Sequence, residues 1–125
     1  GENSQKRIRE SFERIVAEMG HWPTGIVTPD LGFARAIRKE LEDLGLYVPQ
    51  HVSLLGFDAR PFGNAAVPPE ERDISNLQYS WREMAESAWR MFRARLAGVK
   101  APPKRVALVP SYVDFGSLGP RREGP

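Results

Sequence analysis

The chain has no cysteine among its 125 residues, which excludes a disulfide framework and thiolate chemistry and fits a reducing compartment. A large excess of one charge is also missing. The 18 basic and 16 acidic residues leave a net charge of +2, too small to indicate a nucleic-acid surface. No apolar run approaches the ~20 residues that span a membrane, and the polar start GENSQKRIRE is unlike a secretion signal. We therefore expect no membrane association.

Residue types that carry catalytic or metal-binding chemistry are few. His21 and His51 are the only histidines, and neither has a second ligand at metal-binding spacing. The nucleophile elbow GxSxG and the phosphate-binding P-loop are both missing. We predict a soluble globular protein that is not an enzyme and holds no metal or cofactor.

The first half of the chain alternates between helix and strand signals. Residues 4–19 carry apolar side chains at helical spacing. Residues 24–28 are rich in β-branched side chains, which predicts a short buried strand. Residues 31–42 are expected to form a second helix capped by Asp30, and residues 52–57 a second buried strand.

The second half begins with residues 59–73, whose three prolines and lack of periodicity predict a long loop. Ser80 and Glu83 form a capping box that opens a third helix. Its expected core-facing residues are Met84, Ala88, Met91, Phe92 and Leu96. A third strand is predicted at residues 105–109 and a short fourth strand at residues 112–115.

This order of elements is typical of an α/β fold with a parallel sheet. The strands are few, and three helices barely cover a sheet that buries both faces. We therefore predict an incomplete parallel-sheet lobe, over residues 1–117, of a larger α/β domain. Residues 118–125 are expected to form a disordered tail.

Two acidic residues follow predicted strands, at the edge where open parallel sheets bind ligands. Asp30 directly precedes a helix, so capping explains it better than ligand contact does. Asp58 lies in the stretch VSLLGFDARP, residues 52–61, and precedes an irregular loop. An Asx-turn and a ligand contact therefore explain Asp58 equally well.

Several segments between Pro23 and Ser117 resemble one family in order and spacing. PTGIVTPDLGFARAIRKELEDLGLYVPQHVSLLGFDARP is similar to PTA-hydrophobic-xxND…A…GLxVPxDVSVVGFDD. ISNLQYSWREMAESAWRMFRARLAG is similar to LTTVRQPxxELGxxAxxLLxxRLxG, and RVALVPSYVDFGS is similar to xxLLPxELVVRGST. These patterns belong to the C-terminal part of the effector-binding domain in lactose-repressor-type (LacI/GalR) transcription regulators.

The resemblance implies a periplasmic-binding-protein-like I domain, in which two α/β lobes close allosterically over a small molecule, commonly a sugar. The chain would be mainly the second lobe of a cytoplasmic regulator, with DNA bound only by a headpiece outside this chain. Asp58 falls on the family's effector-contacting aspartate, and a carboxylate accepts hydrogen bonds from two hydroxyls. Tyr79 and Trp81 fall near positions that meet the ligand, where an aromatic face suits a sugar ring. Asp30 completes the set of effector-binding candidates.

Two residues depart from the family pattern. Pro29 stands where the family has asparagine, so an amide that often contacts ligand is missing. Ala59 replaces the second acid of GFDD. These changes imply either an atypical effector or an α/β module that has lost its ligand.

The resemblance also implies a homodimer formed through the second helix and the loop after the GFD corner. The candidate apolar contacts across the two-fold axis are Phe33, Phe62 and Val67, although Phe33 also fits the core. A solvated face explains the basic side chains of the third helix better than phosphate binding does. A periplasmic sugar receptor for a transporter shares the fold and is the alternative; it predicts a monomer with a secretion signal.

Overall fold

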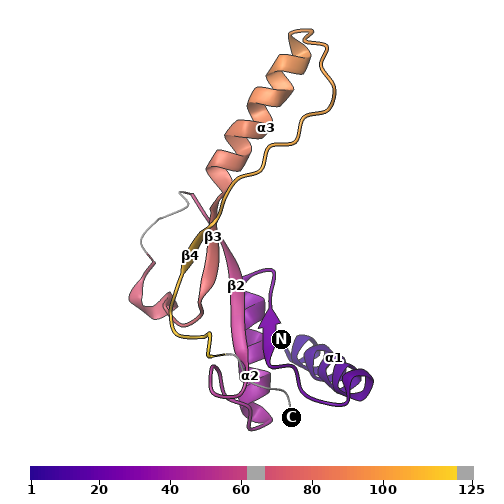
Figure 1. Cartoon of the computed structure of the whole chain (residues 1–125), viewed down its shortest axis with the longest axis vertical. Helices are drawn as coiled ribbons and strands as arrows, with labels where there is room; N and C mark the ends of the chain where they lie inside the picture. The colour runs from indigo at the N-terminus through magenta and orange to yellow at the C-terminus, as the bar shows by residue number, and fades with distance from the viewer. Residues whose placement is uncertain (62–66, 121–125) are drawn as a thin grey trace.

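The structure, a computed structural model, describes residues 1–61 and 67–120 (Figure 1). Helices and strands alternate along the chain. In order they are α1 (Glu2–Met19), β1 (Gly25–Val27), α2 (Leu31–Asp43), β2 (Ser53–Arg60), the 3-10 helix η1 (Pro69–Glu71), β3 (Asn76–Ser80), α3 (Trp81–Leu96) and β4 (Ser111–Val113). No helix in the described part of the chain has the length and apolar character needed to cross a membrane.

The strands form one sheet in the order β1-β2-β3-β4. β1 runs parallel to β2 and β2 parallel to β3, whereas β4 is antiparallel to β3. This mixed α/β architecture with a mostly parallel sheet confirms the predicted fold class. It places the carboxyl ends of β1, β2 and β3 at one edge of the sheet, where ligands of such sheets commonly bind.

The first two helices have the predicted positions because their ends are encoded locally. α1 stops at Gly20, which adopts a left-handed conformation with φ 78° and donates its N–H to the Val16 carbonyl oxygen. The Asp30 side chain caps α2 by accepting a hydrogen bond from the Phe33 N–H at 2.7 Å. Capping therefore accounts for Asp30, as the sequence indicated.

The core lies between α1, α2 and the face of the sheet toward α2. Its buried apolar residues are Ile8, Phe12, Leu31, Ala34, Ile37, Leu41, Val48, Val52, Leu54 and Ile74. α2 approaches β2 so closely at Gly56 that a Cβ there would lie 2.7 Å from the Leu31 Cδ2 atom. A glycine at this position thus lets the helix lie directly on the strand.

β1 is not the buried strand that the sequence predicted. It forms an edge of the sheet, and its residue Val27 is 66% exposed. β-Branched composition cannot distinguish an edge from a centre, because both positions favour the same side chains.

β3 was missed by the sequence prediction, and β2 is longer than predicted. The buried side chains of β3 are the polar ones, Asn76, Gln78 and Ser80, while Leu77 and Tyr79 are only partly buried. The buried positions of β3 therefore carry polar side chains, and its apolar side chains lie on the less buried face. β2 continues through Asp58 to Arg60 because β3 supplies hydrogen-bonding partners that far.

The arm, residues 81–110, extends away from the sheet as helix α3 and a returning chain beside it (Figure 1). Ser80 caps α3 as predicted, accepting the Glu83 N–H at 3.1 Å. The core-facing stripe predicted for this helix is wrong, because none of its residues is buried. The strand predicted at residues 105–109 is also not formed; the described chain has only a short one later, β4.

Candidate functional site

The carboxyl end of β2 carries the candidate effector carboxylate and a basic partner that the sequence interpretation overlooked. Asp58 and Arg60 are two residues apart and lie on the same face of the strand. The Arg60 Nε atom donates to the Asp58 Oδ2 atom at 2.5 Å, and both side chains are 17% exposed. Asp58 thus lies within a paired strand, which corrects the expectation that it opens an irregular loop.

Arg60 also reaches the segment before β3. Its Nη2 atom donates to the Glu71 Oε2 atom at 2.6 Å, and the Glu71 side chain is 41% exposed. The hydrogen bond from Glu71 is the main cause that raises the pKa of Arg60; burial opposes it, and Asp58 adds to it. The guanidinium is therefore charged and bridges two carboxylates.

A second arginine extends this charged cluster onto α2. Arg35 makes a two-pronged contact with Asp73, from Nε to Oδ2 at 3.0 Å and from Nη2 to Oδ1 at 2.9 Å. Asp58 and Glu71 act on it electrostatically and contribute to the rise of its pKa, whose largest cause is the Asp73 hydrogen bond. Two guanidinium groups thus share three carboxylates at this end of the sheet.

Two buried amides lie beside the cluster on β3. Gln78 is the register partner of Asp58, so their side chains lie on the same face of the sheet. Gln78 is 2% exposed, and its Nε2 donor has no hydrogen-bond partner among the described residues. The Asn76 Oδ1 acceptor is likewise unpaired there. Such groups are costly to bury, so an unpaired buried donor calls for an explanation.

The opposite face of the same edge lines an open cavity of about 880 Å³. Tyr79, Phe57 and Pro29 border it from the strand ends. The arm contributes Met84, Ser87, Ala88, Met91, Lys104, Arg105, Val106, Leu108 and Pro110. Apolar side chains thus dominate this cavity.

The structure separates the four effector-binding candidates. Tyr79 borders the cavity, whereas Asp58 points to the other face of the sheet. Asp30 caps α2, and Trp81 is 49% exposed at the start of α3 and does not border the cavity. Arg60 and Gln78 were missed; only the close spacing of Arg60 to Asp58 gave a signal in the sequence.

The dimer candidates also differ in their surroundings. Phe33 is 45% exposed, which leaves it accessible to a partner, while Val67 is 7% exposed within this chain. Phe62 lies outside the described residues, as does part of the predicted tail, residues 121–125. The dimer and the domain boundary remain predictions.

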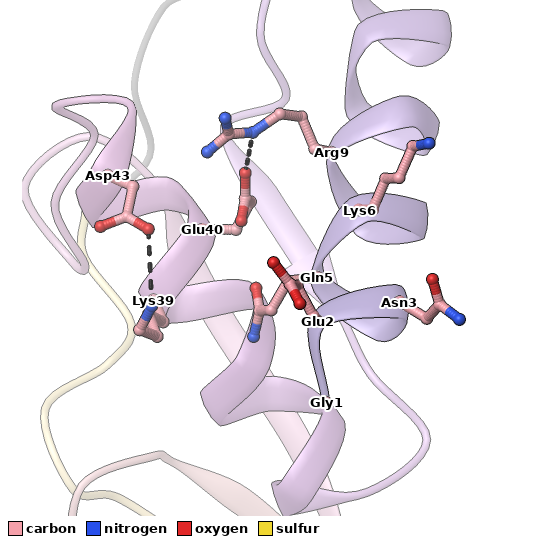
Figure 2. Close-up of a pocket in the computed structure, with 9 residues that line it drawn as sticks. All are labelled: Gly1, Glu2, Asn3, Gln5, Lys6, Arg9, Lys39, Glu40 and Asp43. Carbon is pink, nitrogen blue, oxygen red and sulfur yellow. Dashed lines mark hydrogen bonds and ion pairs between the residues drawn. The ribbon is translucent and has the colours of Figure 1, made fainter.

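A second cleft, of about 790 Å³, lies between α1 and α2 (Figure 2). Arg9 of α1 pairs with Glu40 of α2 across it, and the Glu40 side chain is only 3% exposed. The hydrogen bond to Glu40 is the main cause that raises the pKa of Arg9. Lys39 and Asp43 form a looser pair at 3.7 Å within α2 (Figure 2). These ion pairs hold the two helices together rather than forming a reactive constellation.

Comparison with known proteins defines the class. Residues 1–117 match the family described as periplasmic binding protein-like domain, and the chain belongs to this family. A relative from Rhizobium rhizogenes named "Probable opine utilization operon repressor" is 29% identical over 103 residues, covering 82% of this chain and 50% of that protein. This match supports the resemblance to transcription regulators seen in the sequence.

Solved structures agree with this assignment. A probable transcription regulator from Thermus thermophilus is 26% identical with a TM-score of 0.57, over 92% of this chain and 42% of that one. A LacI family regulator from Arthrobacter sp. FB24 in complex with lactose is 23% identical with a TM-score of 0.59, over 90% of this chain and 40% of that one. A xylose-binding transcription activator is 20% identical with a TM-score of 0.59, over 93% of this chain and 29% of that one. The last two show the fold alone, and the chain spans half or less of each protein.

Proposed function

We propose that this chain is the effector-binding and dimerising part of a LacI/GalR-type transcription regulator, acting in the cytoplasm. The family membership and the regulator relatives support this proposal. The observation that carries it is the position of Asp58, in the GFD motif, near the carboxyl end of β2 in a mostly parallel sheet. Regulators among the relatives favour this function over a periplasmic transport receptor.

The proposed mechanism places a small effector at the carboxyl ends of β1, β2 and β3. Asp58 would accept hydrogen bonds from the effector. Tyr79 points to the opposite face of the sheet, so Tyr79 and Trp81 would offer aromatic faces only to an effector that extends beyond the strand ends. Asp30 is the least favoured contact because its carboxylate already caps α2. A sugar or sugar-like effector is what the resemblance to LacI/GalR-type regulators implies.

The arm supports a two-lobe arrangement for the complete domain. Its apolar side chains Trp89, Phe92, Leu96 and Val109 are 53 to 93% exposed, and the rings of Trp89 and Phe92 lie side by side, 5.7 Å apart between centroids. Residues 105–109 have a strand-like sequence but no strand partner in the described chain. A second α/β lobe would cover the helix and pair with this segment. Effector binding would then change lobe closure, and a dimer would transmit that change to DNA-binding headpieces.

Ligand-dependent thermal melting of the complete two-lobe protein tests the proposed function. We expect at least one of lactose, D-xylose, D-galactose or D-galacturonate to raise the melting temperature. At a ligand concentration 100-fold above the Kd, binding adds about 2.7 kcal/mol to the free energy of unfolding. Asp58→Asn should abolish that shift while preserving the circular dichroism spectrum. Asp43→Asn, which changes an exposed carboxylate at the C-terminal end of α2, is the matched control. If all four sugars leave the melting temperature unchanged, the proposed effector function is wrong.

A further inference from the structure

Building on the effector-binding role above, we propose that the Asp58–Arg60 pair selects a ligand with an anionic group next to a hydroxyl or amino group. Arg60 would be the residue that determines this specificity. The site would then favour a sugar acid or a similar ligand over a neutral sugar.

The geometry presents an acceptor and a donor side by side. The Arg60 guanidinium donates from Nε to Asp58 and from Nη2 to Glu71, and a guanidinium has five N–H donors in total. The Asp58 carboxylate has a second oxygen that is free of the Arg60 contact. Because both side chains retain 17% exposure, their outer edges are accessible from solvent. The pair is thus complementary to a ligand that offers an acceptor anion and a donor together.

A neutral sugar is a poorer match for this pair. An isolated carboxylate binds polyols through neutral hydroxyl donors, but the guanidinium already supplies Asp58 with a stronger, charge-assisted hydrogen bond. A hydroxyl can still donate to the second Asp58 oxygen, but as an acceptor it forms a weaker bond with the guanidinium than a carboxylate does. An anionic group, in contrast, can replace Glu71 on the guanidinium without breaking the bond to Asp58, so Arg60 stays paired with two carboxylates.

Glu71 occupies the position that the anionic group of a ligand would take on Arg60. Its side chain is 41% exposed, compared with 17% for Asp58, so its bond to Arg60 is the more easily exchanged. Glu71 therefore acts as an internal competitor for the ligand. Removing its charge should strengthen ligand binding, and this expectation separates the proposal from a purely structural role for Arg60.

Gln78 provides an independent observation that points to a ligand. It lies opposite Asp58 on β3, is 2% exposed, and its Nε2 donor lacks a partner among the described residues. A ligand acceptor beside Asp58 would satisfy this donor, as it would Arg60. The unpaired Gln78 donor and Arg60 thus both belong to residues of the sheet face that carries Asp58.

The test uses two probes that differ only at C6, D-galacturonate with a carboxylate and D-galactose with a hydroxymethyl group, titrated into the complete two-lobe protein near neutral pH. We expect galacturonate to bind more tightly than galactose. Arg60→Gln should weaken galacturonate binding about tenfold or more and remove the preference. Glu71→Gln should strengthen galacturonate binding about twofold to fivefold. The matched controls Glu70→Gln and Lys39→Gln change the same charges at exposed positions and should leave both affinities unchanged.

Several outcomes overturn the specificity. It is wrong if galactose binds as tightly as galacturonate, or if Arg60→Gln keeps the preference with a native circular dichroism spectrum. If Arg60→Gln does not fold, Glu71→Gln decides, because unchanged galacturonate affinity in that exposed variant also refutes the proposal. Binding of galactose alone would leave the effector function standing while refuting the anionic ligand class. Binding of neither probe, together with no melting shift from lactose or D-xylose, would refute both.

Discussion

The Arg35 guanidinium on α2 donates two hydrogen bonds, of 3.0 and 2.9 Å, to the Asp73 carboxylate, although the residues are 38 positions apart. Arg38, one turn further along, adds a longer contact from its Nη1 atom to the Asp73 carbonyl oxygen at 3.4 Å. α2 therefore holds the chain just before β3, where the charged cluster around Asp58 is completed. Stability and the candidate site share this connection.

Loss of the Arg35–Asp73 contact should destabilise the fold modestly. The two side chains are 39% and 30% exposed, so solvent screens the pair, and we expect Asp73→Asn to lower the free energy of unfolding by about 1 kcal/mol. Urea denaturation measures this change. Glu70→Gln, at a nearby exposed position, should stay within about 0.5 kcal/mol of the parent. Equal effects of the two substitutions would contradict a specific role for Asp73.

The pH dependence of this contact follows from the raised pKa of Arg35, which the Asp73 hydrogen bond causes against the effect of burial. A group with a raised folded-state pKa stabilises fully below its unfolded pKa and loses this contribution only as pH rises through the folded pKa. Both values lie in the strongly alkaline range. The stability difference between the parent and Asp73→Asn should therefore stay constant from about pH 7 to about pH 10. A steady decrease over that interval in urea melts would refute this.

The pairing of Arg9 with Glu40 predicts an asymmetry between its two partners. Glu40 has a side chain that is only 3% exposed, so Arg9→Ala leaves a buried carboxylate unpaired. Glu40→Gln instead removes the buried charge. We expect Arg9→Ala to lower the urea midpoint more than Glu40→Gln does. The opposite order would mean that Arg9, which is half exposed, contributes little to the contact between α1 and α2.

The Asp30 cap can be separated from a role in effector binding. Asp30→Ala should cost about 1 kcal/mol because the Phe33 N–H loses its acceptor, while Asp30→Ser should retain most of the stability. Chemical denaturation distinguishes these variants. If Asp30→Ser melts like the parent but fails to bind a sugar that the parent binds, Asp30 contacts the effector as well.

The core and the arm should respond differently to truncation. Leu54 is fully buried, so Leu54→Ala should cost about 2–5 kcal/mol. Val109 is 93% exposed, and Val109→Ala should change the free energy of unfolding by less than about 0.5 kcal/mol. A large cost at Val109 would show that the arm is covered in solution, for example by self-association. Repeating both melts at several protein concentrations would identify that cause.

Local signals in the sequence were sufficient for features that depend on a few neighbouring residues. The stop at Gly20 and the caps at Asp30 and Ser80 were predictable because each needs only one turn of helix and one side chain. The α/β class followed from the alternation of these elements. The family resemblance likewise rested on short segments whose order and spacing are visible in the chain.

Burial and partnership were decided only by the tertiary structure. The apolar stripe of α3 looked like a core face, yet none of its residues is buried, because an apolar stripe shows what a helix can bury and not what is present to cover it. β3 was hidden because its inward side chains are polar, and their environment depends on β2 and β4. Asp58 was recognisable as a candidate from the sequence. Its engagement by Arg60 and Glu71, and its separation from Tyr79, depend on strand register and on contacts across the chain, which local sequence patterns do not encode.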